Sequence, residues 1–341
     1  MLISKKHTLL KTLNGAETNE LPVWLMRQAG RYLPEYRELK EKYTFNQLSE
    51  NPELAATVTL QPIKRFEELD AAILFADIMS PSKALGFSFE FQPGPVLENP
   101  IRTPDDINKI TVKHVKETNQ YIFDALKIIR KEIPDKALLG FAASPWTLAC
   151  YLIHQGIYKQ HLKTKIFASQ FPEAFDLLCE KISEVTIQYL EECVTSGADA
   201  VQIFDTWASL LSEQEYESLS GKWIRRIVSK LNEKKIPVIV YAQADIPVLN
   251  IIASYKPRVL SVDWKVDLNK FSKIVPADIL IQGNIDPTAL FKPRESIKKI
   301  VTNTYNDLKS SGKVIANLGH GILPETPIDS VHTLLSSIKE L

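Results

Sequence analysis

Eight short apolar runs, separated by longer amphipathic segments, constrain the fold of this chain more than any other feature. Few polar residues interrupt the runs, so each is predicted to be a strand buried on both faces, which is typical of parallel sheets. Between them lie helical patterns, the clearest from Pro172 to Ser196. The predicted strands are Pro22–Met26, Asp70–Phe75, Leu138–Ala142, Ala198–Asp205, Pro237–Ala242, Val259–Trp264, Ala277–Asn284 and Lys313–His320. Eight strand and helix units favour a closed (β/α)8 TIM barrel over an open sheet.

The chain is expected to form one domain that spans residues 1–341. No linker rich in Gly, Pro or Ser divides it, and residues 1–20 could form a flexible arm. The segment Phe87–Val96 alternates aromatic and polar residues around a turn, which predicts a hairpin inserted after the second strand.

Composition excludes several classes of partner. Forty-one basic residues balance 41 acidic ones, so neither nucleic acid nor an anionic membrane is an expected partner. No apolar run is long enough to cross a bilayer, and no secretory signal precedes the first strand. The three cysteines lack CxxC spacing and cannot all pair, which suits a reducing cytoplasm.

Two arginines follow the first predicted strand, at the end where barrel enzymes build their active sites. Arg27 and Arg31 are four residues apart, so one helical turn would place both guanidinium groups on one side, with Gly30 allowing a bend. Guanidinium forks hold carboxylates or phosphates through two bonds. The alternative is that both arginines form surface salt bridges with Glu35 or Glu38.

Asp77 ends the second strand, where a carboxylate is costly to ionise unless donors or cations surround it. It could instead cap the next helix. However, Ser80 and Pro81 already supply a cap and a first helical position, which leaves Asp77 available for a ligand.

Other candidates are weaker when judged from the residues alone. Ser144 and Pro145 start a helix that carries Tyr151 in its second turn, where an aromatic residue usually belongs to the core. His320 lies between two glycines, but no Asp and Ser pattern makes it part of a triad. The six histidines are scattered, which predicts no metal site, and no nucleotide-binding glycine motif is present. A phosphate site near Gly283 and Gly319 remains an option, which would suit a phosphorylated sugar.

Four blocks of sequence resemble the signatures of the uroporphyrinogen decarboxylase family. The longest is PVWLMRQAGRYLPEYR at 22–37, and GFAASPWTL at 140–148 is the second. QGNIDP at 282–287 and NLGHGI at 317–322 add two more. Together these blocks run from residue 22 to 322, which covers nearly the whole chain.

The resemblance implies a single-domain (β/α)8 barrel, usually a homodimer, that acts on uroporphyrinogen III without a metal or organic cofactor. It implies that Arg27 and Arg31 hold or protonate the acidic arms and that Asp77 receives the central pyrrole N–H groups, with Tyr151 as a further catalytic residue. The implied substrate-binding residues are Arg27, Gln28, Ala29, Gly30, Arg31, Asp77, Phe141, Tyr151, Phe204, Thr206 and His320. Thr206 replaces a common serine, and Lys40 replaces a common arginine and is left out of this set.

Two rival functions are weighed against this one. A zinc-dependent corrinoid or thiol methyltransferase of the same barrel superfamily would need a late His and Cys pair, whereas the last cysteine is Cys193. A non-catalytic porphyrin carrier would use the same residues only for binding. Products formed from the tetrapyrrole would distinguish a carrier from a decarboxylase.

Overall fold

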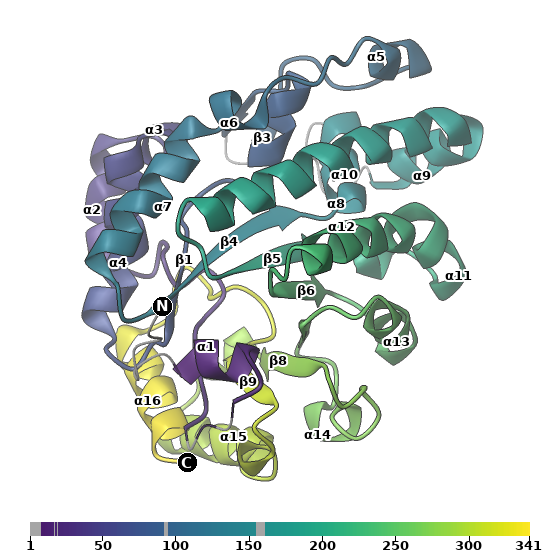
Figure 1. Cartoon of the computed structure of the whole chain (residues 1–341). Helices are drawn as coiled ribbons and strands as arrows, with labels where there is room; N and C mark the ends of the chain where they lie inside the picture. The colour runs from purple at the N-terminus through teal and green to yellow at the C-terminus, as the bar shows by residue number, and fades with distance from the viewer. Residues whose placement is uncertain (1–7, 17, 19, 92–94, 155–160) are drawn as a thin grey trace.

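Seven parallel strands form the central sheet of the computed structural model, which describes residues 8–16, 18, 20–91, 95–154 and 161–341. They pair in the order β1-β4-β5-β6-β7-β8-β9 and curve around a common interior (Figure 1). The strands are β1 (Ala71–Ile73), β4 (Ala137–Ala143), β5 (Ala200–Asp205), β6 (Val238–Ala242), β7 (Val259–Val262), β8 (Leu280–Ile285) and β9 (Val314–Leu318).

The eighth position is occupied by the first predicted run, which bridges the two edge strands. Val23 pairs with Ala316 of β9, and the N–H of Ala316 donates to the carbonyl of Pro22 over 2.8 Å. On the other side, the N–H of Asp70 donates to the carbonyl of Val23 over 2.8 Å. The predicted (β/α)8 barrel is therefore confirmed. The first run is only an isolated bridge rather than a full strand, because the Asp70 carboxylate takes the Val23 N–H.

Helices surround the barrel and alternate with its strands. The α-helices are α1 (Thr8–Leu13), α2 (Pro34–Lys42), α3 (Phe45–Glu50), α4 (Pro52–Arg65), α5 (Pro104–Asn108), α6 (Val115–Thr118), α7 (Gln120–Glu132), α8 (Pro145–His154), α9 (His161–Gln170), α10 (Pro172–Thr195), α11 (Glu213–Tyr216), α12 (Lys222–Glu233), α13 (Ile246–Ser254), α14 (Leu268–Phe271), α15 (Arg294–Tyr305) and α16 (Ile328–Lys339). Short 3-10 turns are η1 (Ser80–Leu85), η3 (Ala208–Leu210), η5 (Pro287–Phe291) and η6 (Lys309–Ser311), and η4 (Glu217–Gly221) is a π-helix. The helix predicted from Pro172 is confirmed as α10.

The predicted hairpin is also confirmed, since β2 (Phe89–Phe91) and β3 (Pro95–Leu97) pair antiparallel. Its turn, residues 92–94, lies outside the described residues.

The strands bury both faces, which explains their nearly continuous apolar sequence. Outward residues such as Leu138 and Val240 pack beneath the helices, whereas Leu139 and Ile239 belong to a separate cluster inside the barrel. That inner cluster ends in Phe141 and Phe204, which are only partly buried. The carboxyl end of the barrel is thus apolar and incompletely covered.

Helix α1 contributes to the inner cluster at the opposite end of the barrel. Leu9 is fully buried and packs with Leu13 in the inner cluster, and α1 lies in front of the barrel in Figure 1. Arg258 donates from Nε to the carbonyl of Leu13 and from Nη2 to that of Thr12, at 2.6 and 3.2 Å, which satisfies the helix end. Part of the segment considered as a flexible arm is therefore an ordered plug.

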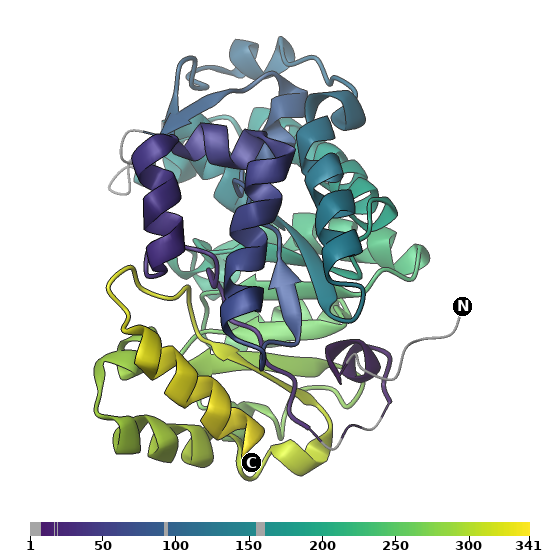
Figure 2. The ribbon, with the colours of Figure 1, turned by 90° about the vertical axis from the view of Figure 1, so that its left-hand side faces the viewer.

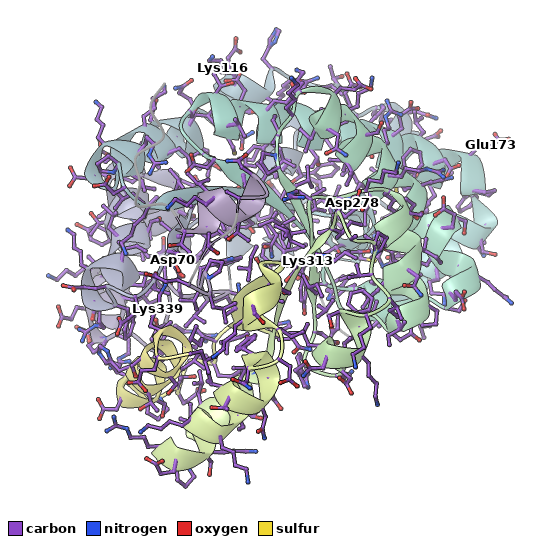
Figure 3. The ribbon with its side chains drawn as sticks, turned by 60° about the horizontal axis from the view of Figure 1, so that its bottom comes forward. Asp70, Lys116, Glu173, Asp278, Lys313 and Lys339 are labelled. Carbon is purple, nitrogen blue, oxygen red and sulfur yellow. The ribbon has the colours of Figure 1, made fainter. Side chains whose placement is uncertain are left out.

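Asp70 connects three distant parts of the chain near this closure. Its Oδ2 accepts from the N–H of Val23 at 2.7 Å and from Nζ of Lys339 at 2.8 Å, and Asp70 and Lys339 lie near each other in Figure 3. Figure 2 shows α4 and α16 on the same side of the barrel, where Phe66 packs edge-on against His332. The two ends of the chain therefore close the barrel together.

Candidate functional site

Arg27 occupies a strained turn at the carboxyl end of the barrel. Its φ of 61° lies in the left-handed region, which a non-glycine residue seldom adopts. Its side chain runs along the backbone of Gly321, where an added Cβ would come within 2.4 Å of Cδ of Arg27. The expected helical turn from Arg27 to Arg31 is wrong, because this backbone forms successive turns until α2 begins at Pro34.

Arg27 is exposed to solvent over part of its surface, yet its guanidinium group is crowded by surrounding protein atoms and lies near charged and polar groups. The pKa of its guanidinium is lowered, chiefly by burial and also by nearby Arg31, whereas Tyr151 and Tyr241 act in the opposite direction. An arginine remains charged at neutral pH in any case. Tyr151, Arg31 and Tyr241 therefore all lie near one guanidinium.

The two arginines have no carboxylate partner of their own. Among the described residues, neither Arg27 nor Arg31 lies within 4.0 Å of an acidic oxygen. Glu35, proposed above as a surface partner, instead binds Arg65 through two bonds of 2.9 Å. Both guanidinium groups are therefore available to an anionic ligand.

Gln28 supports this turn from beneath. Its side chain is fully buried, with Oε1 accepting from the N–H of Leu25 and Nε2 donating to the carbonyl of Ala71, at 3.0 and 2.9 Å. Both polar atoms of the Gln28 side chain are thus used by backbone, and its place among the substrate-binding residues stays a prediction. Ala29 and Gly30 are partly buried and keep their positions beside Arg27.

Asp77 lies in the loop that follows β1. Its Oδ1 accepts from the N–H of Met79 at 3.1 Å, and burial raises the pKa of its carboxyl to about 7. The N–H groups of Met79 and Ile78 and the ammonium of Lys83 lower this pKa, while Glu50 raises it. No side chain among the described residues hydrogen-bonds the carboxylate. Asp77 is thus a carboxylate poised between its two charge states near neutral pH.

The predicted cap at Ser80 is wrong in one respect. Helix η1 begins at Ser80 itself, and the preceding Met79 has no side-chain cap. The Ser80 hydroxyl instead donates back to the carbonyl of Asp77 at 2.7 Å. The Asp77 turn therefore starts the helix one residue earlier than expected.

Tyr151 links Arg27 to Asp77. It projects from α8, whose Ser144 cap is confirmed by a 3.1 Å bond from the N–H of Thr147, and its ring stacks on Trp207 at 4.6 Å. The pKa of its phenol is raised, chiefly by burial and then by the charge of Asp77, while Arg27 lowers it. The one side chain therefore interacts electrostatically with both charged groups.

A row of aromatic rings lines the same end of the barrel. Phe141 meets Phe204 at 5.7 Å, Phe204 meets Tyr241 at 5.8 Å, and Tyr241 meets His320 at 6.2 Å between centroids. Burial, and then the charge of Arg27, lower the pKa of His320 to about 4, so its imidazole is neutral at pH 7. The row presents flat apolar surface beside the two arginines.

Tyr241 is a site residue that sequence reasoning missed. It is 1% exposed, and its hydroxyl donates to the carbonyl of Gly319 at 3.1 Å, which orders the glycine loop around His320. The only available signal was its place near the carboxyl end of a predicted strand, where an aromatic residue is more often core.

Asp205 fixes the helix that carries Tyr151. This fully buried carboxylate accepts from the hydroxyls of Ser144, Tyr216 and Ser220 at 2.6, 2.9 and 2.9 Å. Its neighbour Thr206 is partly buried and keeps a hydroxyl without a hydrogen bond in the described structure. Asp205 is therefore structural, and Thr206 is the residue that could touch a ligand.

The cysteines are poorly placed to bind a metal. Cys150, Cys179 and Cys193 are all fully buried, and burial raises the pKa of each thiol. Within the described residues no group of three or more His, Cys, Asp and Glu side chains could hold a metal ion. The same part of the chain contains no helix of the length and apolar character that a membrane span requires.

Comparison with known proteins decides the family. The family model described as uroporphyrinogen decarboxylase (URO-D) matches residues 4–341. The chain belongs to the uroporphyrinogen decarboxylase family. A protein named uroporphyrinogen decarboxylase from Carboxydothermus hydrogenoformans is 40% identical, covering 98% of this chain and 96% of that protein. One from Christiangramia forsetii is also 40% identical, covering 98% of each chain.

A solved structure extends the likeness in fold. The methyltransferase from Methanosarcina mazei superposes with a TM-score of 0.82 over 98% of each chain, at 21% identity. Identity at this level shows a shared barrel and not a shared reaction.

Proposed function

We propose that the protein removes carbon dioxide from the four acetate side chains of uroporphyrinogen III and so produces coproporphyrinogen III. The observation that carries this proposal is the grouping, around Tyr151, of the carboxyl group of Asp77 and the guanidinium group of Arg27, with Arg31 beside Arg27 and no acidic partner for either arginine among the described residues. A macrocycle with acidic arms around a centre of pyrrole N–H groups is complementary to that arrangement. Family membership supplies the identity of the macrocycle.

Each step consumes one proton and breaks one carbon–carbon bond. Loss of carbon dioxide leaves an electron pair on the arm, so the adjoining pyrrole must first be protonated at carbon to accept that pair. A proton then adds to the arm and completes the methyl group, while the pyrrole carbon releases its own. The protein must therefore deliver a proton and stabilise a transient pyrrolic cation.

Asp77 is assigned the role of stabilising the transient pyrrolic cation. In its ionised form it accepts the central N–H groups and offsets the positive charge that develops on protonation. Its raised pKa, about 7, means that the free protein gains the ionised form as pH rises through neutrality. Activity should therefore fall in acid.

Arg27 and Arg31 are assigned the role of binding the acidic side chains of the macrocycle. Arg27 and Arg31 each offer a planar fork to a carboxylate that is not reacting. The family resemblance favours Arg27 as the proton donor to the pyrrole, and burial, which lowers the pKa of Arg27, acts in the direction that such a role needs. Tyr151 then orients both partners.

The remaining contacts are assigned to the face of the macrocycle and to its edge. Phe141 and Phe204 offer apolar surface, and Thr206 offers a hydroxyl. His320, neutral at pH 7, and the backbone of Ala29 and Gly30 complete the set. We further propose a cytoplasmic homodimer that needs no metal or organic cofactor. The three free thiols support the compartment, and the family resemblance supports the dimer. Analytical ultracentrifugation of the purified protein tests the dimer.

Anaerobic incubation with uroporphyrinogen III, followed by counting the carboxylates of the oxidised products, tests the function. The wild-type protein should yield a tetracarboxylated product. Asp77→Asn should fold normally but lose activity by about two orders of magnitude or more. Asp124→Asn, which removes a carboxylate that is 42% exposed, is the matched control and should keep full activity. Substrate returned with all its carboxylates would identify a carrier.

A further inference from the structure

A second charged cluster, formed by side chains of η1, α3 and α7, lies beside Asp77. Lys83, in η1, places Nζ 2.8 Å from a carboxylate oxygen of Glu50 in α3 and 4.5 Å from the ring centroid of Tyr121 in α7. The Lys83 side chain is 24% exposed, so this ammonium is largely withdrawn from water. Nothing in the proposed reaction uses it so far.

A small cavity joins this cluster to the proposed site. Asp77, Ser80, Lys83, Glu50 and Tyr121 all line it, and its volume of about 10 Å³ is close to the space that one water molecule needs. Asp77 and Lys83 therefore border the same small cavity, and in the described part of the chain Lys83 forms its ion pair with Glu50 and not with Asp77.

We propose that Lys83 is a positioning residue, whose ammonium, held by Glu50 and Tyr121, keeps the Asp77 carboxylate ionised from behind while its other side receives the substrate. The inference rests on the role proposed for Asp77. A buried carboxylate without a cation nearby would be largely protonated at neutral pH and could not stabilise a pyrrolic cation. Lys83 supplies that cation without occupying the substrate's side of Asp77.

The charge states of the cluster agree with this assignment. Burial lowers the pKa of Lys83, but Tyr121 and Glu50 together outweigh burial and leave it above its ordinary value. Burial also raises the pKa of Tyr121, so its phenol is neutral at pH 7 and acts on Lys83 as a hydrogen-bond partner, which leaves Glu50 as the charged partner. Lys83 is therefore charged under working conditions.

Among the residues that the structure describes, the other elements packed against η1 add no competing charge at this point. Helix α10 presents Tyr189, whose fully buried phenol has a pKa well above its ordinary value. Helix α6 carries Lys116, which pairs outward with Glu192 of α10 at 3.3 Å. Among the described residues, Lys83 and Glu50 are thus charges that act on Asp77 in opposite directions, while Tyr151, which faces Asp77 from α8, has a raised pKa and is neutral at pH 7.

The direction in which two substitutions shift the acidic midpoint of kcat/KM tests the proposal. Lys83→Met should move the acidic midpoint of kcat/KM to higher pH by about one unit, which lowers activity about tenfold below the midpoint and leaves the alkaline plateau within about twofold. Glu50→Gln should move the midpoint to lower pH, because it removes the like charge. Lys116→Met, with a side chain 62% exposed and labelled in Figure 3, is the control and should leave the profile unchanged.

If Lys83 had a purely structural role, Lys83→Met would lower the alkaline plateau of kcat/KM and leave its acidic midpoint in place. That result would overturn the proposal. So would midpoint shifts in the same direction in Lys83→Met and Glu50→Gln. Carbon-13 NMR titration of the Asp77 carboxyl group, assigned with Asp77→Asn, measures the same midpoints without substrate. If the wild-type protein fails to decarboxylate, the proposed function falls, while the NMR midpoints still decide whether Lys83 controls Asp77.

Discussion

Gly321→Ala should inactivate the protein by displacing Arg27, although glycine has no side chain with which to bind substrate. A Cβ at position 321 would lie 2.4 Å from Cδ, 2.7 Å from Cγ and 2.9 Å from Nε of Arg27. An ordinary contact begins at 3.4 Å, so the side chain must retreat by 3.4 minus 2.4, or 1.0 Å. A misplacement of about 1 Å can reduce turnover about 100-fold.

The fold should tolerate this change. The clashing atoms belong to a flexible side chain that water reaches, and Gly321 is not among the glycines with positive φ. We expect the midpoint of thermal unfolding to stay near that of the wild type. Gly312→Ala offers the opposite case, because its φ of 63° strains alanine while no atom lies within 4 Å of the new Cβ. It should lower stability by about 1 kcal/mol and leave activity unchanged.

A double-mutant cycle identifies the cause. Steady-state kcat and KM are measured for the wild type, Gly321→Ala, Arg27→Ala and the double variant. If Gly321 acts through Arg27, the double variant should be no slower than Arg27→Ala alone. Independent, multiplying losses would refute the reasoning, as would a fully active Gly321→Ala.

Three further predictions concern stability and are measured by chemical or thermal unfolding. Leu9→Ala should lower the free energy of unfolding by about 2 to 5 kcal/mol, because it leaves a cavity where helix α1 closes the barrel. Leu10 is only partly buried, so Leu10→Ala should lower it by less. Equal losses of stability in the two variants would argue against this role of α1. Lys339→Met should cost about 2 kcal/mol by leaving Asp70 without its cation, whereas Lys298→Met, in an exposed pair, should cost at most about 0.5 kcal/mol. His320 binds a proton at about pH 4 in the folded protein but at 6.5 when unfolded, so the unfolded state gains protons first and stability falls as pH drops from 6.5 to 4. His320→Gln should remove up to about 3 kcal/mol of that fall, and an unchanged pH dependence would contradict the assignment.

Local pattern carried enough information to predict the barrel. Continuous apolar runs report burial on both faces, and this property of each strand does not depend on its partners. Pattern also located Arg27, Arg31 and Asp77, because charged residues directly after such runs must lie at the carboxyl end of the sheet. The same reasoning located Ser144 as a helix cap, since capping depends on neighbouring residues alone.

Side-chain direction and long-range contact could not be predicted in this way. Gln28 and Arg27 are adjacent in the sequence, yet one side chain turns into the core and the other stays accessible, because the left-handed turn at Arg27 reverses the chain. The close approach of the Arg27 side chain to Gly321 brings together residues that are far apart in the sequence, as does the bond from Lys339 to Asp70 across 269 residues.

The sequence by itself therefore determined the architecture and the kinds of group at the barrel end, since both follow from local burial and charge. Only the tertiary structure decided which of those groups interact and in which charge state. The ionisation of Asp77 depends on burial and on Lys83 and Glu50, whose side chains come from different elements. Electrostatic energy varies with distance and solvent exposure, and folding alone sets both.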